Sequence, residues 1–231
     1  MGLLDFIFPK YCISCKKIGS YLCDKCFSYI KFSDSNICLF CQKPSIDSLT
    51  HPGCRGKYVI DGSFSALEYK GSVKKLIYTF KYRPHLSDLR DTLTDLFYES
   101  LIQKEEFYKL LSNKNLTIAP IPLHNSKLKK RGYNQAEILA GRLAEKFNLK
   151  AKNLLERIRN TKSQFKLKKE ERRENVKNAF EIKSKGLKDL REKSIFLVDD
   201  VLTTGSTLLE AANVLKRNGA KKVYGITLAR D

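Results

Sequence analysis

Apolar residues beyond residue 58 recur with either the two-residue period of a β-strand or the 3.6-residue period of an amphipathic helix. Strands are predicted at residues 64–69, 117–120, 154–158, 179–182, 195–198 and 223–228. Helices are predicted at residues 72–81, 88–102, 134–147 and 208–218, the last closed by Gly219. Strands that alternate with helices form a parallel sheet flanked by helices, so the sequence predicts an α/β fold.

The most distinctive stretch follows the apolar run at residues 195–198, where two carboxylates mark the predicted end of a strand. They are Asp199 and Asp200, and a loop of small residues follows: Thr203, Thr204, Gly205, Ser206 and Thr207. Backbone N–H groups and hydroxyls before a helix bind phosphate, and carboxylates suit ribose hydroxyls or Mg²⁺. The alternative is a buried strand that ends in solvated aspartates. The full order of residues favours a phosphate site, and it resembles the loop of type I phosphoribosyltransferases that binds phosphoribosyl pyrophosphate (PRPP).

All seven cysteines lie before residue 55, mostly in pairs separated by two residues. Such a pair places two ligands on one tight turn, and two turns complete a tetrahedral zinc site. Disulfides are the competing interpretation, but the paired spacing with a histidine in one position argues against them. His51 could be incidental, although the Pro52-Gly53 turn before Cys54 favours a ligand. We expect two structural Zn²⁺ ions, one at Cys12, Cys15, Cys23 and Cys26, the other at Cys38, Cys41, His51 and Cys54.

The net charge of +19 is concentrated in the middle of the chain. Residues 121–180 hold 17 Lys and Arg against 6 Asp and Glu, a surplus of 11, whereas the surplus in residues 1–60 is 4. A field this one-sided attracts polyanions, and nucleic acid is the leading candidate; a solvated lysine-rich face is the alternative. The predicted DNA contacts are Lys129, Lys130 and Arg131 for phosphates, with Tyr133 and Phe165 as residues on which a base can stack.

A chain of 231 residues can hold one domain of ordinary size and a small module. We place a double zinc ribbon at residues 1–57 and the α/β domain at residues 58–231. No apolar run approaches the about 18 residues of a membrane span, and the N-terminus lacks the basic residues of a signal peptide. These features predict a cytoplasmic chain with no membrane span.

Together these motifs resemble the ComF family of competence proteins from end to end. The matching segments are Leu3-Leu4-Asp5 with Phe8-Pro9, the cysteine pairs, Pro120-Ile121-Pro122, Arg131-Gly132-Tyr133-Asn134-Gln135, Arg159-x-Thr161-x-x-Gln164, Arg172-x-x-Asn175 with Ala179-Phe180, and the Asp199-Asp200 loop. One position departs from the family pattern, because His51 stands where the family usually has cysteine.

The resemblance implies a cytoplasmic protein that handles incoming single-stranded DNA during natural transformation, with a helicase or membrane channel of the uptake machinery as a partner. It also implies a phosphoribosyltransferase-like fold that takes PRPP or a nucleotide with Mg²⁺. Residues 120–135 then hold pyrophosphate through Arg131, Gly132, Asn134 and Gln135, and residues 159–173 form a flap. In an active enzyme, Asp199 and Asp200 orient the ribose, while Arg131 and Mg²⁺ stabilise the departing pyrophosphate.

Two classes of function remain open at this point. The first is a DNA-handling protein that uses a phosphoribosyltransferase fold to bind PRPP or a nucleotide. The second is an active phosphoribosyltransferase that acts on a base or small amine in nucleotide salvage. The surplus of positive charge exceeds what one PRPP requires, and zinc ribbons suit a polymer-binding protein. We therefore favour the first.

Overall fold

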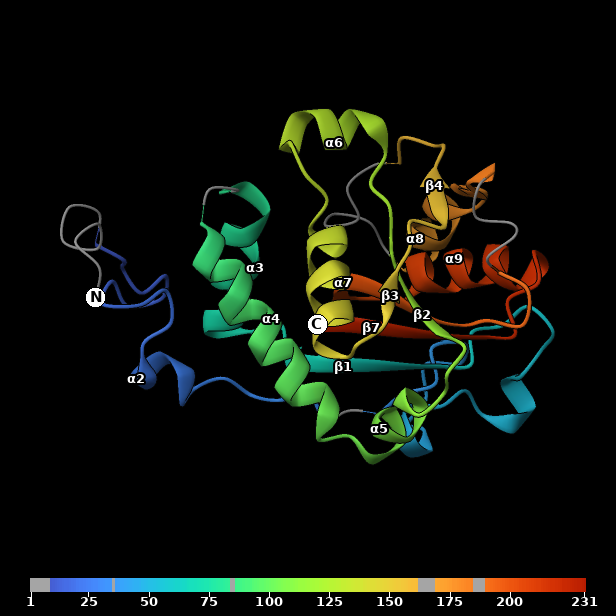
Figure 1. Ribbon diagram of the computed structural model, residues 1–231, viewed down its shortest axis with the longest axis horizontal. Helices are drawn as coiled ribbons and strands as arrows, with labels where there is room; N and C mark the ends of the chain where they lie inside the picture. Colours follow the sequence, from blue (N-terminus) through green and yellow to red (C-terminus); the bar gives the residue numbers. More distant parts are fainter. Residues whose placement is uncertain (1–8, 35, 84–85, 162–168, 185–189) are drawn as a thin grey trace.

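The computed structural model describes residues 9–34, 36–83, 86–161, 169–184 and 190–231 (Figure 1). Its centre is a five-stranded parallel sheet of order β1-β7-β6-β2-β3. The strands are β1 (Gly62–Glu68), β2 (Leu116–Pro120), β3 (Lys150–Ala151), β6 (Ser194–Leu202) and β7 (Lys222–Arg230). The predicted α/β fold class, with a parallel sheet, is therefore confirmed.

Helices cover both faces of this sheet. They are α3 (Gly71–Tyr82), α4 (Ser87–Ile102), α5 (Glu105–Leu111), α7 (Gln135–Lys146) and α9 (Ser206–Arg217). Along β6, Phe196 and Val198 join the cluster built with α3, α4, α5 and α7, whereas Ile195 and Leu197 join the cluster built with α9. A strand buried on both faces needs consecutive apolar residues, which explains the unbroken run at residues 195–198.

The strand that carries the two aspartates is longer than the sequence predicts. β6 continues through Asp199 and Asp200 to Leu202, because it pairs with β7 as far as Arg230. The carboxylates therefore lie within the last part of the strand and not beyond its end. Helix α9 also begins earlier than residue 208, at Ser206.

Two predicted strands do not enter the main sheet. β4 (Leu155–Arg157) and β5 (Phe180–Ile182) form a separate antiparallel pair. The reason lies in their pattern: Leu155 and Phe180 are buried, while Glu156 and Glu181 are exposed. Such alternation suits a pair with one solvated face better than a central parallel strand.

Several short helices lack the apolar period by which the longer ones were predicted. They are α2 (Asp24–Phe27), α6 (Asn125–Arg131) and α8 (Lys169–Val176), with single 3₁₀ turns at Ile46–Ser48 (η1) and Pro52–Cys54 (η2). α8 overlaps the end of residues 159–173, which the family resemblance predicts to be a flap. α6 has no buried residue and is defined by its ends: the His124 side chain accepts from the N–H of Ser126, and Gly132 takes a left-handed φ of 83°.

The two halves of the zinc ribbon pack against opposite faces of the sheet. Ile13 and Leu22, from the first half, contact the cluster that includes α3 and α4, and Figure 1 shows this segment (dark blue) next to α3. Ile37 and Leu39, from the second half, belong to the cluster that includes α9. Among the described residues, no helix combines the length and hydropathy that a membrane crossing requires.

Candidate functional site

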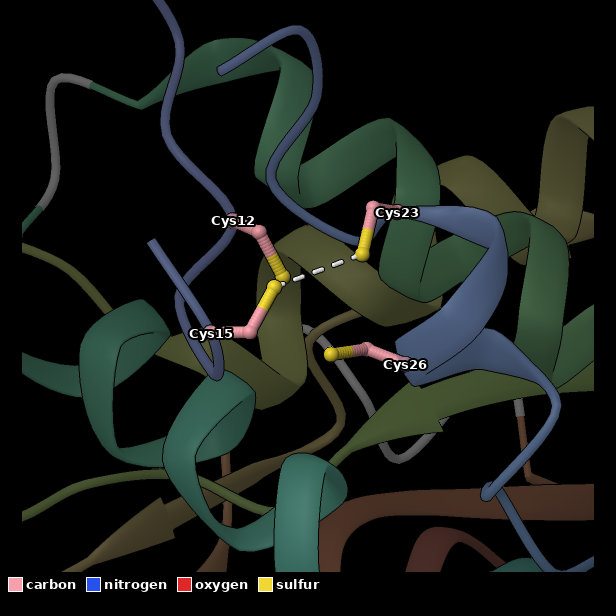
Figure 2. A group of neighbouring side chains, drawn as sticks. All are labelled: Cys12, Cys15, Cys23 and Cys26. Atoms are coloured by element: carbon pink, nitrogen blue, oxygen red, sulfur yellow. Dashed lines mark hydrogen bonds between the residues drawn. The ribbon is translucent and has the colours of Figure 1, made fainter. Parts of the chain in front are cut away.

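The four cysteines of the first half-ribbon converge on one point. Figure 2 shows the side chains of Cys12, Cys15, Cys23 and Cys26 directed toward one another. Their sulfur atoms lie within 4.8 Å of one another, and Cys15 Sγ is 3.5 Å from Cys23 Sγ. Zn–S bonds of about 2.3 Å in a tetrahedron separate the sulfurs by about 3.8 Å. This cluster fits one zinc ion.

The thiols of this cluster differ in their affinity for protons. Burial raises the pKa of Cys12, but backbone hydrogen bonds from Cys23, Cys15 and Ser14 outweigh it and lower the pKa to about 6. Burial and the neighbouring sulfurs raise the pKa of Cys26 to about 12. Four thiolates at this spacing therefore need a cation between them, and structural Zn²⁺ supplies one.

The second cluster contains Cys38, Cys41, His51 and Cys54, and their ligand atoms also lie within 4.8 Å of one another. His51 Nε2 is 2.8 Å from the carbonyl oxygen of Pro44, and Nδ1 is 3.3 Å from Cys41 Sγ. Because a carbonyl only accepts, Nε2 carries the proton and Nδ1 keeps its lone pair for a metal. A ligating histidine typically donates its other N–H in this way. His51 is thus oriented as a zinc ligand.

A cavity of about 340 Å³ lies where the carboxyl end of β6 meets the start of α9, and we call it the phosphate cavity. Nine of the predicted ligand-binding residues line it: Arg131, Asn134, Gln135, Asp199, Asp200, Thr203, Gly205, Ser206 and Thr207. The structure therefore brings together two motifs that are more than sixty residues apart in the sequence. Gly132 and Thr204 are not part of the lining.

The loop between β6 and α9 is shaped by Gly205, which has a left-handed φ of 74°. A Cβ atom at this position would lie 2.9 Å from Leu39 Cδ2, so the second half-ribbon packs directly on the loop. The side-chain amide of Gln42 also donates to the carbonyl of Thr204, at 3.3 Å. Thr204 Oγ1 and Ser206 Oγ are 2.9 Å apart at the start of α9, where the helix dipole favours an anion.

The two aspartates have different electrostatic surroundings. Burial and the charge of Asp200 raise the pKa of Asp199 to about 7. Asp200 forms an ion pair with Lys81, whose Nζ is 2.7 Å from Oδ2. Burial alone would lower the pKa of Lys81, but the attraction of Asp200 raises it. Without a ligand, the site therefore holds one paired carboxylate and one carboxyl that is half protonated near neutral pH.

Cations also line the phosphate cavity: Lys127, Arg131 and Arg157. Burial and the positive charges of Arg157 and Arg131 lower the pKa of Lys127. Arg157 Nε is buried without a hydrogen-bond partner in the part of the chain that the structure describes. Like charges at this density favour a bound anion between them. Lys81, Lys127 and Arg157 were not among the predicted site residues. Lys127 and Arg157 belong to the basic segment at residues 121–180, which could have indicated them, whereas Lys81 lies outside it.

Family models match most of this chain. Residues 3–55 match the double zinc ribbon domain, and residues 128–231 match the phosphoribosyl transferase domain. Competence protein F of Haemophilus influenzae is 28% identical over 91% of this chain and 97% of the relative. Competence protein ComFC of Bacillus subtilis is 29% identical, over 91% of this chain and 84% of the relative. This chain is therefore similar to ComF-family competence proteins along most of its length, with a double zinc ribbon followed by a phosphoribosyl transferase domain.

A further relative, the DNA utilization protein YhgH of Salmonella typhi, is 37% identical over 49% of this chain and 48% of the relative. The two family models match the order of modules that the sequence predicted. The double zinc ribbon model and the two ligand clusters together support structural zinc.

Other predicted site residues have structural partners. Asn134 caps α7: its side chain accepts from the N–H of Ala136 and donates to the carbonyl of Ile121. The Tyr133 ring is partly buried, 6.1 Å from the ring of Phe80 and 5.7 Å from the guanidinium of Arg90. Tyr133 is therefore packed against other side chains and does not lie free among charges as expected; its role as a base contact stays a prediction. Lys129 and Lys130 are exposed on α6. Phe165 lies outside the described residues.

Proposed function

We propose that this protein handles single-stranded DNA during DNA uptake, and that its phosphate cavity binds PRPP or a nucleotide with Mg²⁺. It acts in the cytoplasm beside the helicase or channel of the uptake machinery. The observation that carries this proposal is the similarity, over 91% of the chain, to two proteins named for competence. A third relative is named for DNA utilization. These names favour DNA handling over nucleotide salvage, so we do not propose the salvage enzyme.

The lining of the phosphate cavity supports a phosphorylated ligand. Lys127, Arg131 and Arg157 repel one another unless an anion lies among them. Two aspartates line the same cavity, and carboxylates suit ribose hydroxyls and a divalent cation. A ligand with both a ribose and a pyrophosphate, such as PRPP, suits the carboxylates and the cations at once.

The residues that line this cavity would each bind a different part of the ligand. The N–H groups and hydroxyls at the start of α9 would bind the 5′-phosphate. Arg131, Lys127 and Arg157 would bind the pyrophosphate. Asp199 and Asp200 would orient the ribose and hold Mg²⁺, which supplies positive charge to the pyrophosphate when it is bound. This arrangement positions a ligand, and it supports binding without requiring turnover.

The charge of the chain supports a polyanionic partner. A net charge of +19 is more than one PRPP neutralises, and 11 of these charges belong to the surplus in residues 121–180. Lys129 and Lys130 project from α6, which has no buried residue. Exposed lysines attract a phosphate backbone without reading its sequence.

Fluorescence anisotropy with a labelled single-stranded oligonucleotide tests the proposal. We expect wild-type protein to bind the single strand more tightly than a duplex of the same length. Exchange of Lys129, Lys130 and Arg131 for Glu should weaken this binding strongly, whereas Lys150→Glu, an exposed charge reversal on β3, serves as a matched control. Absence of single-strand binding even at low salt would overturn the proposal.

A further inference from the structure

A second, larger hollow of about 1230 Å³ lies between the first half-ribbon and helix α3. We call it the ribbon groove; its lining residues are drawn from 9–21 and 69–83, with Leu86 and Arg131. Ser72 Oγ donates to Ser14 Oγ at 3.1 Å, and Lys75 Nζ donates to the carbonyl of Ser14 at 3.4 Å. These bonds fix the ribbon against the helix. The groove exceeds the about 300–1,000 Å³ typical of small-molecule pockets, so it has room for a segment of a polymer.

Aromatic rings dominate the wall of the ribbon groove that α3 provides. Tyr78 and Tyr82 are 64% and 59% exposed, and their ring centroids are 4.8 Å apart. Residues four apart on a helix share a face, so both rings project on the same side. Tyr11, Tyr21 and Tyr69 line the same groove. Large exposed rings in this arrangement offer platforms on which bases stack.

Positive charges alternate with these rings. The groove is lined by Lys16, Lys74, Lys75, Lys81, Arg83 and Arg131, and no carboxylate occurs among the described lining residues. The guanidinium of Arg131 lies 5.5 Å from the centre of the Tyr82 ring, and Lys74 Nζ lies 6.0 Å from that of Tyr69. A chain that presents a planar base and a phosphate at each step matches this repeated pairing of ring and cation.

The ribbon groove lies beside the phosphate cavity. Tyr69, Lys74, Lys81 and Arg131 line both. A polymer in the groove would therefore have its phosphates close to residues that also line the smaller site. These shared residues couple the groove to the site already described.

We infer that the ribbon groove binds single-stranded DNA, with bases stacked on Tyr78 and Tyr82 and phosphates near Lys16, Lys75 and Arg83. This inference rests on the proposed DNA-handling function and names its binding surface. A duplex hides its base faces, so stacking on these rings selects the single strand. The rings of Tyr78 and Tyr82 are exposed, whereas Tyr133 packs against Phe80 and Arg90.

The test compares variants for binding to a labelled oligothymidylate by fluorescence anisotropy. Tyr78→Ala with Tyr82→Ala should weaken binding about tenfold or more, since each stacked base contributes substantially. Phe at both positions keeps the rings and should restore binding to within about threefold of wild type. Tyr108→Ala is the matched control, because Tyr108 is 65% exposed on α5 and does not line the groove. Inorganic polyphosphate, which has charges but no bases, should bind the double alanine variant as well as the wild type.

Photo-crosslinking adds a readout that does not depend on a variant. Oligonucleotides that carry 5-iododeoxyuridine should crosslink wild-type protein at peptides containing Tyr78 or Tyr82. Crosslinks confined to other peptides would overturn the inference, as would wild-type affinity in the double alanine variant or equal weakening toward polyphosphate. If wild-type protein binds no single strand at all, the proposed function fails. If binding persists in the tyrosine variant but is lost when Lys129 and Lys130 are reversed to Glu, only the groove assignment fails.

Discussion

Lys81 Nζ lies 2.7 Å from Asp200 Oδ2, and this ion pair joins the last turn of α3 to the aspartates of β6. Lys81 also lines both the ribbon groove and the phosphate cavity. Asp200 partly neutralises the charge of Lys81. A ligand that contacts Lys81 in the ribbon groove therefore changes the charge available to a ligand in the phosphate cavity, and the reverse also holds. The two binding surfaces are therefore expected to influence one another.

Because the two surfaces share Lys74, Lys81 and Arg131, PRPP with Mg²⁺ should weaken the binding of single-stranded DNA. We expect the Kd for an oligonucleotide to rise about fivefold at saturating PRPP, and DNA to weaken PRPP by the same factor. Calorimetric titration of each ligand in the presence of the other measures both. Lys81→Gln should reduce the mutual effect, and independent binding of the two ligands would contradict this account.

The aspartates can be tested by thermal unfolding. PRPP with Mg²⁺ should raise the melting temperature of the wild type, because a ligand that binds only the folded state stabilises it. Asp199→Asn with Asp200→Asn should remove most of this increase without loss of the circular dichroism of the folded protein. Asp95→Asn, which removes an exposed carboxylate paired with Lys146, is the control. Wild-type affinity in the double variant would show that the ribose site lies elsewhere.

The pKa of about 7 for Asp199 predicts how ligand binding varies with pH. Mg²⁺ and a ribose require the ionised carboxylate, so a proton must leave Asp199 below pH 7 before they bind. Affinity for PRPP with Mg²⁺ should therefore fall about tenfold from pH 8 to pH 6. The Asp199→Asn variant has no titratable group at this position, so its profile shows the pH dependence of affinity that does not come from Asp199, such as that of the ligand phosphates. A wild-type profile no steeper than that of the variant would contradict the assignment.

Zinc removal should affect the stability of the two modules differently. We expect two Zn²⁺ per chain by elemental analysis, one for each cluster. A module of about fifty residues has too small a core to fold without metal, so chelation should unfold the ribbon and leave most of the sheet domain intact. A count near one would leave only the all-cysteine site, and a metal-free protein with paired disulfides would contradict the ribbon interpretation.

The contact of Leu39 with Gly205 predicts that the second half-ribbon supports the phosphate loop. Gly205→Ala forces a left-handed conformation on alanine, which costs about 1–2 kcal/mol, and also crowds Leu39. Its melting temperature and its affinity for PRPP should both fall. Leu39→Ala in addition relieves the crowding but not the backbone strain, so the affinity for PRPP should recover only in part, while the loss of a buried side chain lowers the melting temperature further. Complete recovery of the affinity would show that backbone strain plays no part in ligand binding.

Local patterns in the sequence were enough to predict four of the five strands of the main sheet, its longer helices and nine of the residues that line the phosphate cavity. The unbroken apolar run at residues 195–198 predicts a buried strand, and the small residues after Asp200 predict a phosphate-binding loop. Both signals lie within a few consecutive residues. The antiparallel pair of β4 and β5 was not predicted, because a short alternating run does not specify its partner. The length of β6 depends on pairing with β7, which the run itself does not contain.

Contacts between distant residues explain what the sequence could not indicate. Lys81 and Asp200 are more than a hundred positions apart, and only the packing of α3 beside β6 brings them together. Tyr133 is flanked by charged residues in the sequence, yet Phe80 and Arg90 cover its ring from other helices. In the sequence, nothing distinguishes Tyr78 and Tyr82 from other residues of a helix. In the structure, they line a groove together with the first half-ribbon.

The most direct test of the central claim is the salt dependence of single-strand binding by the wild-type protein. Fluorescence anisotropy at two or more salt concentrations gives the slope of log affinity against log salt. With four to six phosphates neutralised, we expect a slope of roughly −3 to −4 and no strong preference among base sequences. A slope near zero, or no binding of single-stranded DNA at any salt concentration, would contradict the account.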